Sequence, residues 1–180
     1  GDTRLNVDWD ADYVNYWREH GTGANRVDLF PRLSMPVPIS DYLESTANVG
    51  VRDTLYFVQK FEDANWPGDE IENRFLLDLE AEIGTTLIRN FDMALLNAPA
   101  WRHTFRPFVN YRYVPDVDQN ELPQLDSVDR IDDMNLISYG LDNFFNLAGT
   151  KNGNDFDKYF GFLKVQQGYD LRSEKSDVPW

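Results

Sequence analysis

Apolar and polar residues alternate along the chain from its opening segment. That segment divides into an apolar set and a polar set: Leu5, Val7, Trp9, Ala11 and Tyr13 against Asn6, Asp8, Asp10 and Asp12. A period of two is that of a β-strand, because successive side chains of a strand point to opposite faces. The pattern therefore predicts a strand with one apolar and one polar face.

The same alternation returns in six further segments. They cover residues 27–37, 43–51 with 55–58, 75–87, 102–114, 136–147 and 159–171. No segment shows a convincing helical period. The sequence therefore predicts an all-β protein of about seven antiparallel strands, with a turn-rich connection at 149–155.

Three prolines interrupt the second segment, at Pro31, Pro36 and Pro38. Proline has no backbone N–H, so each one removes a donor from a strand ladder. They fit an edge strand, a bulge or a strand end better than the centre of a sheet.

The predicted strands are long, at about 9 to 14 residues, where strands of globular proteins are usually about five or six. Their connections alternate between short, as at Ser40–Asp41, and long, as at 59–70 and 115–135. Length and asymmetry of this kind are typical of tilted strands that cross an outer membrane. A soluble antiparallel sheet with one wet face gives the same alternation and stays open as an alternative.

Composition narrows the classes of partner. The formal net charge is -14, which argues against nucleic acid, because binding to phosphates requires a basic face. Aromatic residues make up 14 % of the chain, far from the aromatic-poor composition of acidic disordered segments. There is no cysteine, so disulfides and thiolate chemistry are excluded.

The chain has no targeting segment that we recognise. Gly1–Arg4 does not open a signal peptide, and no apolar run is long enough for a membrane helix. The strand pattern begins at once, and Val178–Trp180 has no terminal signal. We therefore expect this chain to be a piece of a larger protein.

The region 103–138 carries the most specific pattern in the chain. It contains Tyr-Val-Pro at 113–115, an acidic loop, and Asp-Arg-Ile-Asp-Asp-Met-Asn at 129–135. This region resembles the LPS-assembly family LptD, also called OstA; Leu125 stands where that family more often has Phe. The resemblance marks a family-motif set: Tyr113, Val114, Pro115, Asp118, Gln119, Leu122, Pro123, Asp126, Ser127, Asp129, Arg130, Asp132 and Asn135.

The resemblance implies both a fold and a function. It implies an up-and-down transmembrane β-barrel in the Gram-negative cell outer membrane, which inserts lipopolysaccharide into the outer leaflet. The plug lipoprotein LptE and the periplasmic bridge protein LptA are the implied partners. About seven strands cannot close the very large barrel of this family, so residues 1–180 are expected to be an internal part of it, without the periplasmic jelly-roll domain.

Other functions remain open from the sequence alone. A porin-like barrel and a soluble β-rich carbohydrate-binding module fit the same alternation. A hydrolase is disfavoured because only His20 and His103 are available as bases and no nucleophile matches them. We therefore expect no enzyme activity and no cofactor.

Polar residues on the predicted strands suggest ion pairs more than a metal site. The candidates for a lumen-facing set are Asp78, Glu80, Glu82, Arg106, Asn110 and Arg112. Calcium could bind the carboxylates of this set or of the 115–135 loop, but the EF-hand register is missing, so no metal is expected. The arginines could touch lipid phosphates, but salt bridges with the acidic strand are the preferred interpretation.

The 115–135 loop is too long for an idle hairpin connection. We expect it to fold against the rest of the protein, and the family resemblance implies that it helps to plug or shape the lumen; a mobile extracellular loop is the alternative. Pairs of Arg130 with Asp126 or Asp133 are expected to order it.

Overall fold

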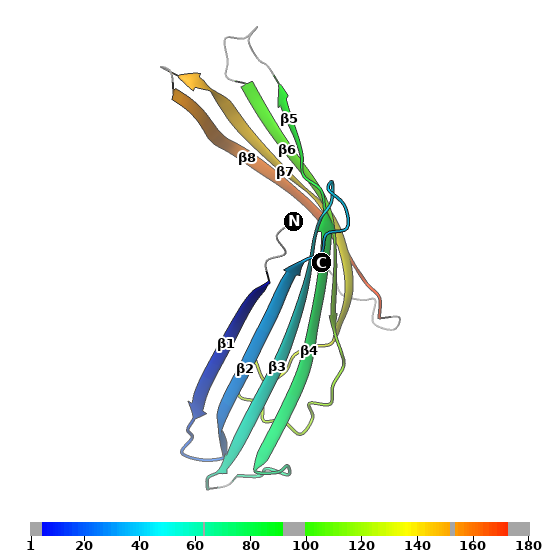
Figure 1. Ribbon diagram of the computed structural model, residues 1–180. Helices are drawn as coiled ribbons and strands as arrows, with labels where there is room; N and C mark the ends of the chain where they lie inside the picture. Colours follow the sequence, from blue (N-terminus) through cyan, green and yellow to red (C-terminus); the bar gives the residue numbers. More distant parts are fainter. Residues whose placement is uncertain (1–4, 63, 92–99, 152–153, 173–180) are drawn as a thin grey trace.

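The part of the chain that the structure describes folds as one antiparallel sheet (Figure 1). The computed structural model describes residues 5–62, 64–91, 100–151 and 154–172. Its strands are β1 (Asn6–Tyr16), β2 (Thr22–Pro36), β3 (Glu44–Lys60), β4 (Ile71–Gly84), β5 (Leu87–Phe91), β6 (Ala100–Val114), β7 (Met134–Lys151) and β8 (Asn154–Asp170). The predicted all-β antiparallel class is confirmed. No helix in the described part of the chain has the length and hydropathy needed to cross a membrane.

The strands follow one another in the sheet as they do in the sequence. The order is β1-β2-β3-β4-β6-β7-β8, and β5 pairs with β6 beyond the end of β4. Residues 1–4 and 173–180 lie outside the described part, as do residues 152–153 of the turn predicted at 149–155. In the described part β1 and β8 are the two outer strands, so the sheet is open.

The register gives the sheet two chemically different faces. Except in the first part of β8, residues 154–159, every pairing joins two odd-numbered or two even-numbered residues, as in Val7 with Leu33 and Leu33 with Val49. In that part of β8 the odd-numbered and even-numbered positions exchange faces. Paired residues lie on the same face. The apolar odd-numbered positions of all strands therefore form one face, which we call the apolar face, and the even-numbered positions form the polar face.

The apolar face is the exposed one. Large side chains on it that are open to solvent include Val7, Trp9, Leu29, Phe75, Val109, Leu141 and Val165. The buried apolar cluster is small, with Tyr56, Val58 and Leu122 at its centre and Trp66 packed against it. Burial is thus reversed relative to a soluble sheet, which hides its apolar face.

Pro31 lies inside the sheet, so the edge-strand interpretation of its segment is wrong. It sits in β2, between β1 and β3, and pairs with Trp9. The β2–β3 ladder runs from Leu29 opposite Asp53 to Arg32 opposite Gly50, with no pairs between. The sheet accommodates the missing donor by a local gap in one ladder. Pro36 ends β2, as the strand-end alternative predicted.

The described part of the sheet has eight strands, one more than expected, because segment 75–87 is divided. β4 ends at Gly84, and β5 continues in the same register against β6 from Leu87 opposite Phe105. Pro107 lies opposite the break, where its carbonyl accepts the N–H of Thr85 at 3.2 Å. The two parts predicted at 43–51 and 55–58, by contrast, belong to the single strand β3, Glu44–Lys60.

β6 is displaced along β4. It pairs with β4 only over Leu79–Gly84, so Ile71–Asp78 has its ladder on the β3 side. Figure 1 shows the consequence: β1–β4 occupy one half of the bent sheet, and β5 with the far ends of β6–β8 occupies the other. The 115–133 connection leaves β6 at mid-sheet and crosses beside the free half of β4.

Candidate functional site

The predicted polar residues of β4 and β6 form a ladder on the polar face. Arg112 Nη2 lies 2.7 Å from Asp78 Oδ2, Asn110 Nδ2 lies 2.7 Å from Glu80 Oε1, and Arg106 Nη2 contacts Glu82 Oε1. All six predicted residues are thus brought together, three from each strand. Their salt bridges satisfy the arginines within the protein.

A second set of paired charges spans β2, β3 and β4. Arg52 donates to both carboxylate oxygens of Asp28, at 3.0 and 2.7 Å, and Thr54 Oγ1 donates to Asp28 at 2.6 Å. Arg74 Nη2 in turn donates to Thr54 Oγ1 at 3.0 Å. Arg74 and Thr54 are buried, which requires something to cover this face.

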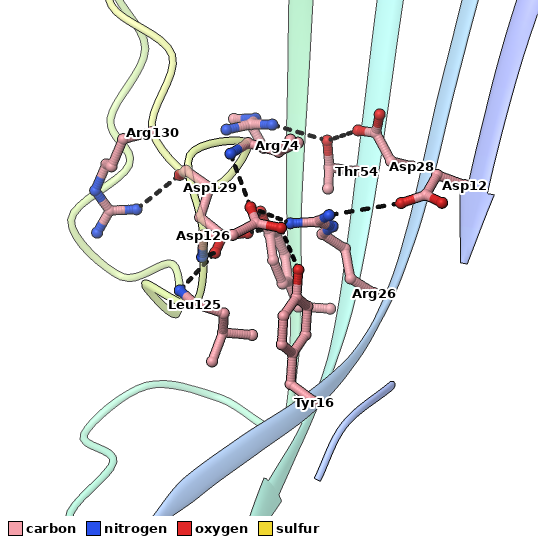
Figure 2. Close-up of polar contacts among 12 residues, drawn as sticks. Asp12, Tyr16, Arg26, Asp28, Thr54, Arg74, Leu125, Asp126, Asp129 and Arg130 are labelled. Carbon is pink, nitrogen blue, oxygen red and sulfur yellow. Dashed lines mark hydrogen bonds and ion pairs between the residues drawn. The ribbon is translucent and has the colours of Figure 1, made fainter. Parts of the chain in front are cut away.

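The cover is the connection between β6 and β7, residues 115–133, which we call the docked loop. Figure 2 shows it lying over the polar face of β2–β4, with Asp126 and Asp129 turned toward the strands. Asp129 is 0 % exposed. Its Oδ1 accepts hydrogen bonds from Arg26 Nη1 at 2.9 Å and from the Tyr56 hydroxyl at 2.8 Å.

Asp129 also organises the loop itself. Its Oδ2 accepts the backbone N–H groups of Leu125 at 2.5 Å and Asp126 at 2.6 Å. One carboxylate therefore closes a tight turn on one side and binds two strands on the other. Four hydrogen bonds compensate its burial, as a fully buried charge requires.

Asp126 supplies a second carboxylate to the same cation. Its Oδ1 lies 2.6 Å from Arg26 Nη1, and its Oδ2 accepts a hydrogen bond from the Tyr16 hydroxyl. The Arg26 guanidinium, followed by the Tyr16 hydroxyl and the Val128 N–H, holds the pKa of Asp126 well below its usual range. Arg26 is only 2 % exposed and also lies 3.6 Å from Asp12, so a single buried cation joins β1, β2 and the docked loop.

Gln119 and Leu122 attach the first half of the docked loop. The Gln119 side chain accepts from Arg74 at 3.1 Å and exchanges two hydrogen bonds with the backbone of Ile131, at 2.8 and 3.1 Å. Leu122 packs into the small apolar cluster beside Trp66, and Pro123 is fully buried. The loop is thus held by a polar anchor and an apolar one.

The predicted ion pairs of Arg130 are wrong. Arg130 donates to the backbone carbonyls of Asp129 at 3.0 Å and Leu122 at 3.1 Å, so it braces the loop's own backbone. Asp133 instead pairs with Arg172, at 2.9 Å. The cation that Asp126 binds comes from a distant strand, since Arg26 is 100 residues away.

The remaining family-motif residues frame the docked loop. Tyr113 and the buried Val114 end β6, and Pro115 begins the loop. Asp118 Oδ1 accepts the N–H of Asn120 at 3.0 Å, and Asn135 Oδ1 accepts the Tyr111 hydroxyl at 3.1 Å. Ser127 and Asp132 are exposed.

Neither histidine forms a catalytic arrangement. His103 stacks on Phe145, with ring centroids 4.8 Å apart, and its Nε2 lies 3.0 Å from Asn143 Oδ1. His20 lies 3.9 Å from Glu62 in exposed loops. Across residues 5–62, 64–91, 100–151 and 154–172, no three His, Asp or Glu side chains group closely enough to hold a metal ion.

Sequence reasoning missed the strand half of the docking site. Tyr16, Arg26, Tyr56 and Arg74 all occupy even-numbered positions, where the alternation expects polar residues. The available signal was an arginine or tyrosine on the polar face of each of four successive strands, β1–β4, matched to carboxylates in a long loop. Nothing in the spacing of the chain links those two features.

Comparison with known proteins agrees with the pattern at 103–138. A family model described as "LptD: LPS transport system D" matches residues 1–178. The LPS-assembly protein LptD of Nitrosococcus oceani is 33 % identical over 125 residues, which are 68 % of this chain and 16 % of the relative. That of Methylococcus capsulatus is 28 % identical over 170 residues, which are 81 % of this chain and 15 % of the relative. The chain thus spans about a sixth of the length of these relatives.

Proposed function

The chain belongs to the LptD family, and from this we propose that it forms part of the outer-membrane translocon that inserts lipopolysaccharide into the outer leaflet. Its role is that of a wall segment of a transmembrane β-barrel, with no chemical step. Family membership favours this function over a small-solute pore or a soluble carbohydrate-binding module.

The separation of the two faces carries the proposal. The apolar face exposes large side chains along β1–β4 and β6–β8, which suits contact with acyl chains. The polar face is lined by paired charges, which suits a wet lumen. Outer-membrane barrels alternate in this way along every strand. A glycolipid needs both environments, because its sugars and its acyl chains take different paths.

Aromatic side chains support a membrane boundary on the apolar face. Trp101 and Phe145 lie 5.8 Å apart between ring centroids, and Phe160 meets Trp101 edge-on at 5.6 Å. They gather in the halves of β6, β7 and β8 that lie away from the docked loop. Aromatic girdles of this kind sit at the level of lipid headgroups in outer-membrane barrels.

The docked loop gives the barrel wall a fixed inner layer over β2–β4. We propose that it shapes the lumen by narrowing it at the end where the long connections lie, which in outer-membrane barrels is the extracellular end. The plug lipoprotein LptE inside the barrel and the periplasmic bridge protein LptA are the proposed partners. They follow from the family, and no contact surface for them is assigned.

Cysteine labelling in the full-length protein tests the two faces. Val165 and Gln166 are neighbours on β8 and point to opposite faces, and this sequence has no cysteine of its own. We expect a membrane-impermeant maleimide to label Gln166→Cys and not Val165→Cys in membranes, and to label both after solubilisation and unfolding. Equal labelling of both in membranes contradicts the proposal.

A depletion experiment tests the transport function. Reducing the full-length protein in its native cells should lower the fraction of new lipopolysaccharide that reaches the cell surface, measured by modification with a surface-restricted enzyme. Unchanged surface delivery would count against a translocon role.

A further inference from the structure

The polar face carries a second feature on β7 and β8, toward the other edge of the sheet from β2–β4, which the docked loop covers. An open pocket of about 360 Å³ lies on β7 and β8 and is lined by Asp142, Phe144, Tyr159, Phe162 and Lys164. None of these residues takes part in the contacts that hold the docked loop. The pocket is a separate site on the same face.

A β-bulge builds this pocket. From Gly161 to Asp170 the β7–β8 pairs join even with even or odd with odd numbers, as in Phe144 with Phe162. On the other side of the bulge, in residues 154–159 of β8, odd numbers pair with even ones, as in Tyr159 with Asn146. The extra residue is Phe160, and it leaves Tyr159 on the polar face instead of the apolar one. Bulges are known to re-aim side chains in this way beside functional sites.

The three rings of the pocket are exposed although they lie on the polar face. Phe162 is 66 % exposed, and Phe144 and Tyr159 are also open to solvent. Two other rings of this face are covered differently: Phe30 lies under Arg32 at 4.9 Å, and Phe108 lies under Lys164 at 5.3 Å. Phe144, Tyr159 and Phe162 therefore offer bare ring faces for contact with a ligand.

The charged side chains at the rim of the pocket neutralise one another. Lys164 Nζ lies 3.7 Å from Asp142 Oδ1, and Arg106 Nη1 lies 3.9 Å from Asp142 Oδ2. The cations are already matched by carboxylates, so the rim has no surplus charge for a phosphate. It does offer ammonium and carboxylate groups that can donate to and accept from hydroxyls.

We propose that this pocket binds a sugar ring, with the CH face of the sugar stacked on Phe162 and Phe144 and its hydroxyls bonded by Asp142 and Lys164. Tyr159 closes the side that the bulge creates. A flat apolar ring beside paired donors and acceptors matches a saccharide, which has an apolar face and a polar edge. An acyl chain would take these charged rim groups out of water and offer them no hydrogen bond in return. The inference rests on the proposed function, which supplies a glycolipid whose saccharide passes along this face.

Photo-crosslinking with the full-length protein tests the proposal. The probe p-benzoylphenylalanine is placed at position 162, and the matched control carries it at position 160. The two positions are equally exposed, at 66 % and 64 %, but Phe160 contacts Trp101 on the apolar face. Purified protein is irradiated with deacylated lipopolysaccharide, which keeps the sugars and phosphates and lacks the acyl chains.

We expect a saccharide adduct at position 162 and none at position 160, with the position-160 probe reacting with lipid or detergent. The proposal is overturned if no saccharide adduct forms at position 162. It is also overturned if the two positions give equal amounts of adduct. A position-162 probe that reacts only with lipid, or only with another part of the protein, overturns it as well, because the pocket would then have a different occupant.

A binding measurement gives the second test. Phe162→Leu keeps an apolar side chain but removes the flat ring, and should weaken binding of deacylated lipopolysaccharide roughly tenfold, while Phe160→Leu leaves it unchanged. Equal affinities of the Phe162→Leu variant and the parent protein contradict the proposal.

The two experiments separate this inference from the proposed function. If the pocket binds no saccharide but depletion still blocks surface delivery, the pocket assignment fails and the translocon role stands. If the pocket binds saccharide but depletion leaves delivery unchanged, the translocon role fails.

Discussion

The hydroxyl of Tyr56 donates a hydrogen bond of 2.8 Å to Asp129, a residue 73 positions further along the chain. Both side chains are fully buried, although the face on which they meet is the polar one. The contact joins β3 to the docked loop, so it converts a long connection into a fixed layer of the protein.

Asp129→Asn should release the docked loop. The neutral amide leaves the buried Arg26 guanidinium with Asp126 as its remaining carboxylate from the loop, and removing one partner of a buried ion pair costs about 3 kcal/mol. The free energy of local opening should fall by that amount, measured by hydrogen exchange of the amides in 124–131. Asp132→Asn, an exposed change on the same loop, should alter it by less than about 0.5 kcal/mol. Equal exchange rates in the two variants would show that Asp129 does not hold the docked loop in place.

Arg26 and Asp129 should be energetically coupled. Arg26→Met alone leaves Asp129 buried without its cation, whereas the double variant with Asp129→Asn removes both charges. We expect the double variant to be more stable than the sum of the single changes by about 2 kcal/mol. The measurement is a double-mutant cycle on loop opening. Additive effects would mean that the 2.9 Å contact contributes nothing.

Docking should survive mild acid. Arg26 lowers the pKa of Asp126 in the folded protein, and the unfolded value is about 3.9. A carboxylate with a depressed pKa adds stability above its unfolded pKa and loses it as pH falls through the folded one. The emission of Trp66, which packs beside Leu122, should therefore stay constant from pH 7 to about 4 and change only in stronger acid.

Both proteins in this pH experiment retain Trp66 as their single tryptophan, and the control also carries Asp126→Asn. That variant should dock less tightly at neutral pH and should lose the part of the acid transition that Asp126 contributes. A midpoint of the parent protein near the unfolded pKa of Asp126 would contradict the ion pair with Arg26.

Gly140 should not tolerate a side chain. A Cβ at this position would lie 2.6 Å from the Val165 carbonyl oxygen and 2.9 Å from the Phe108 ring. The first contact is with backbone, which cannot move without shifting β8, so Gly140→Ala should cost about 1 to 3 kcal/mol in the free energy of unfolding. Gly161→Ala is the matched control, since a Cβ there meets nothing within 4 Å. Denaturant unfolding in detergent measures both, and equal stabilities would contradict the close packing of β7 on β8.

The alternation of side chains predicted most of the sheet because it depends on neighbouring residues alone. The period of two located the strands and their faces, and both follow from the backbone of a strand. The division between β4 and β5 was not predictable, because the proline opposite the break, Pro107, belongs to another strand. The face on which Tyr159 lies was also not predictable, because one extra residue in β8 moves Tyr159 from the apolar to the polar face.

The docking site was only half predictable. A connection as long as 115–135 had to fold against something, and its carboxylates marked it as the polar half of an ion-pair network. Its partner could not be named, because Arg26 is one of several arginines at even-numbered positions and only the register of the sheet selects it. Arg130 was chosen for its closeness in sequence, and it turned inward to the loop's own carbonyls.

The chain is synthesised from its N-terminus, so the strand residues that hold the docked loop are made before the loop itself. β1–β4 are complete long before residue 129 is made, since Arg26 precedes Asp129 by 103 positions. Until then the guanidinium groups of Arg26 and Arg74 have no loop above them, and hydration must satisfy them. The polar face of these strands therefore stays in contact with water until the segment between β6 and β7 docks on it.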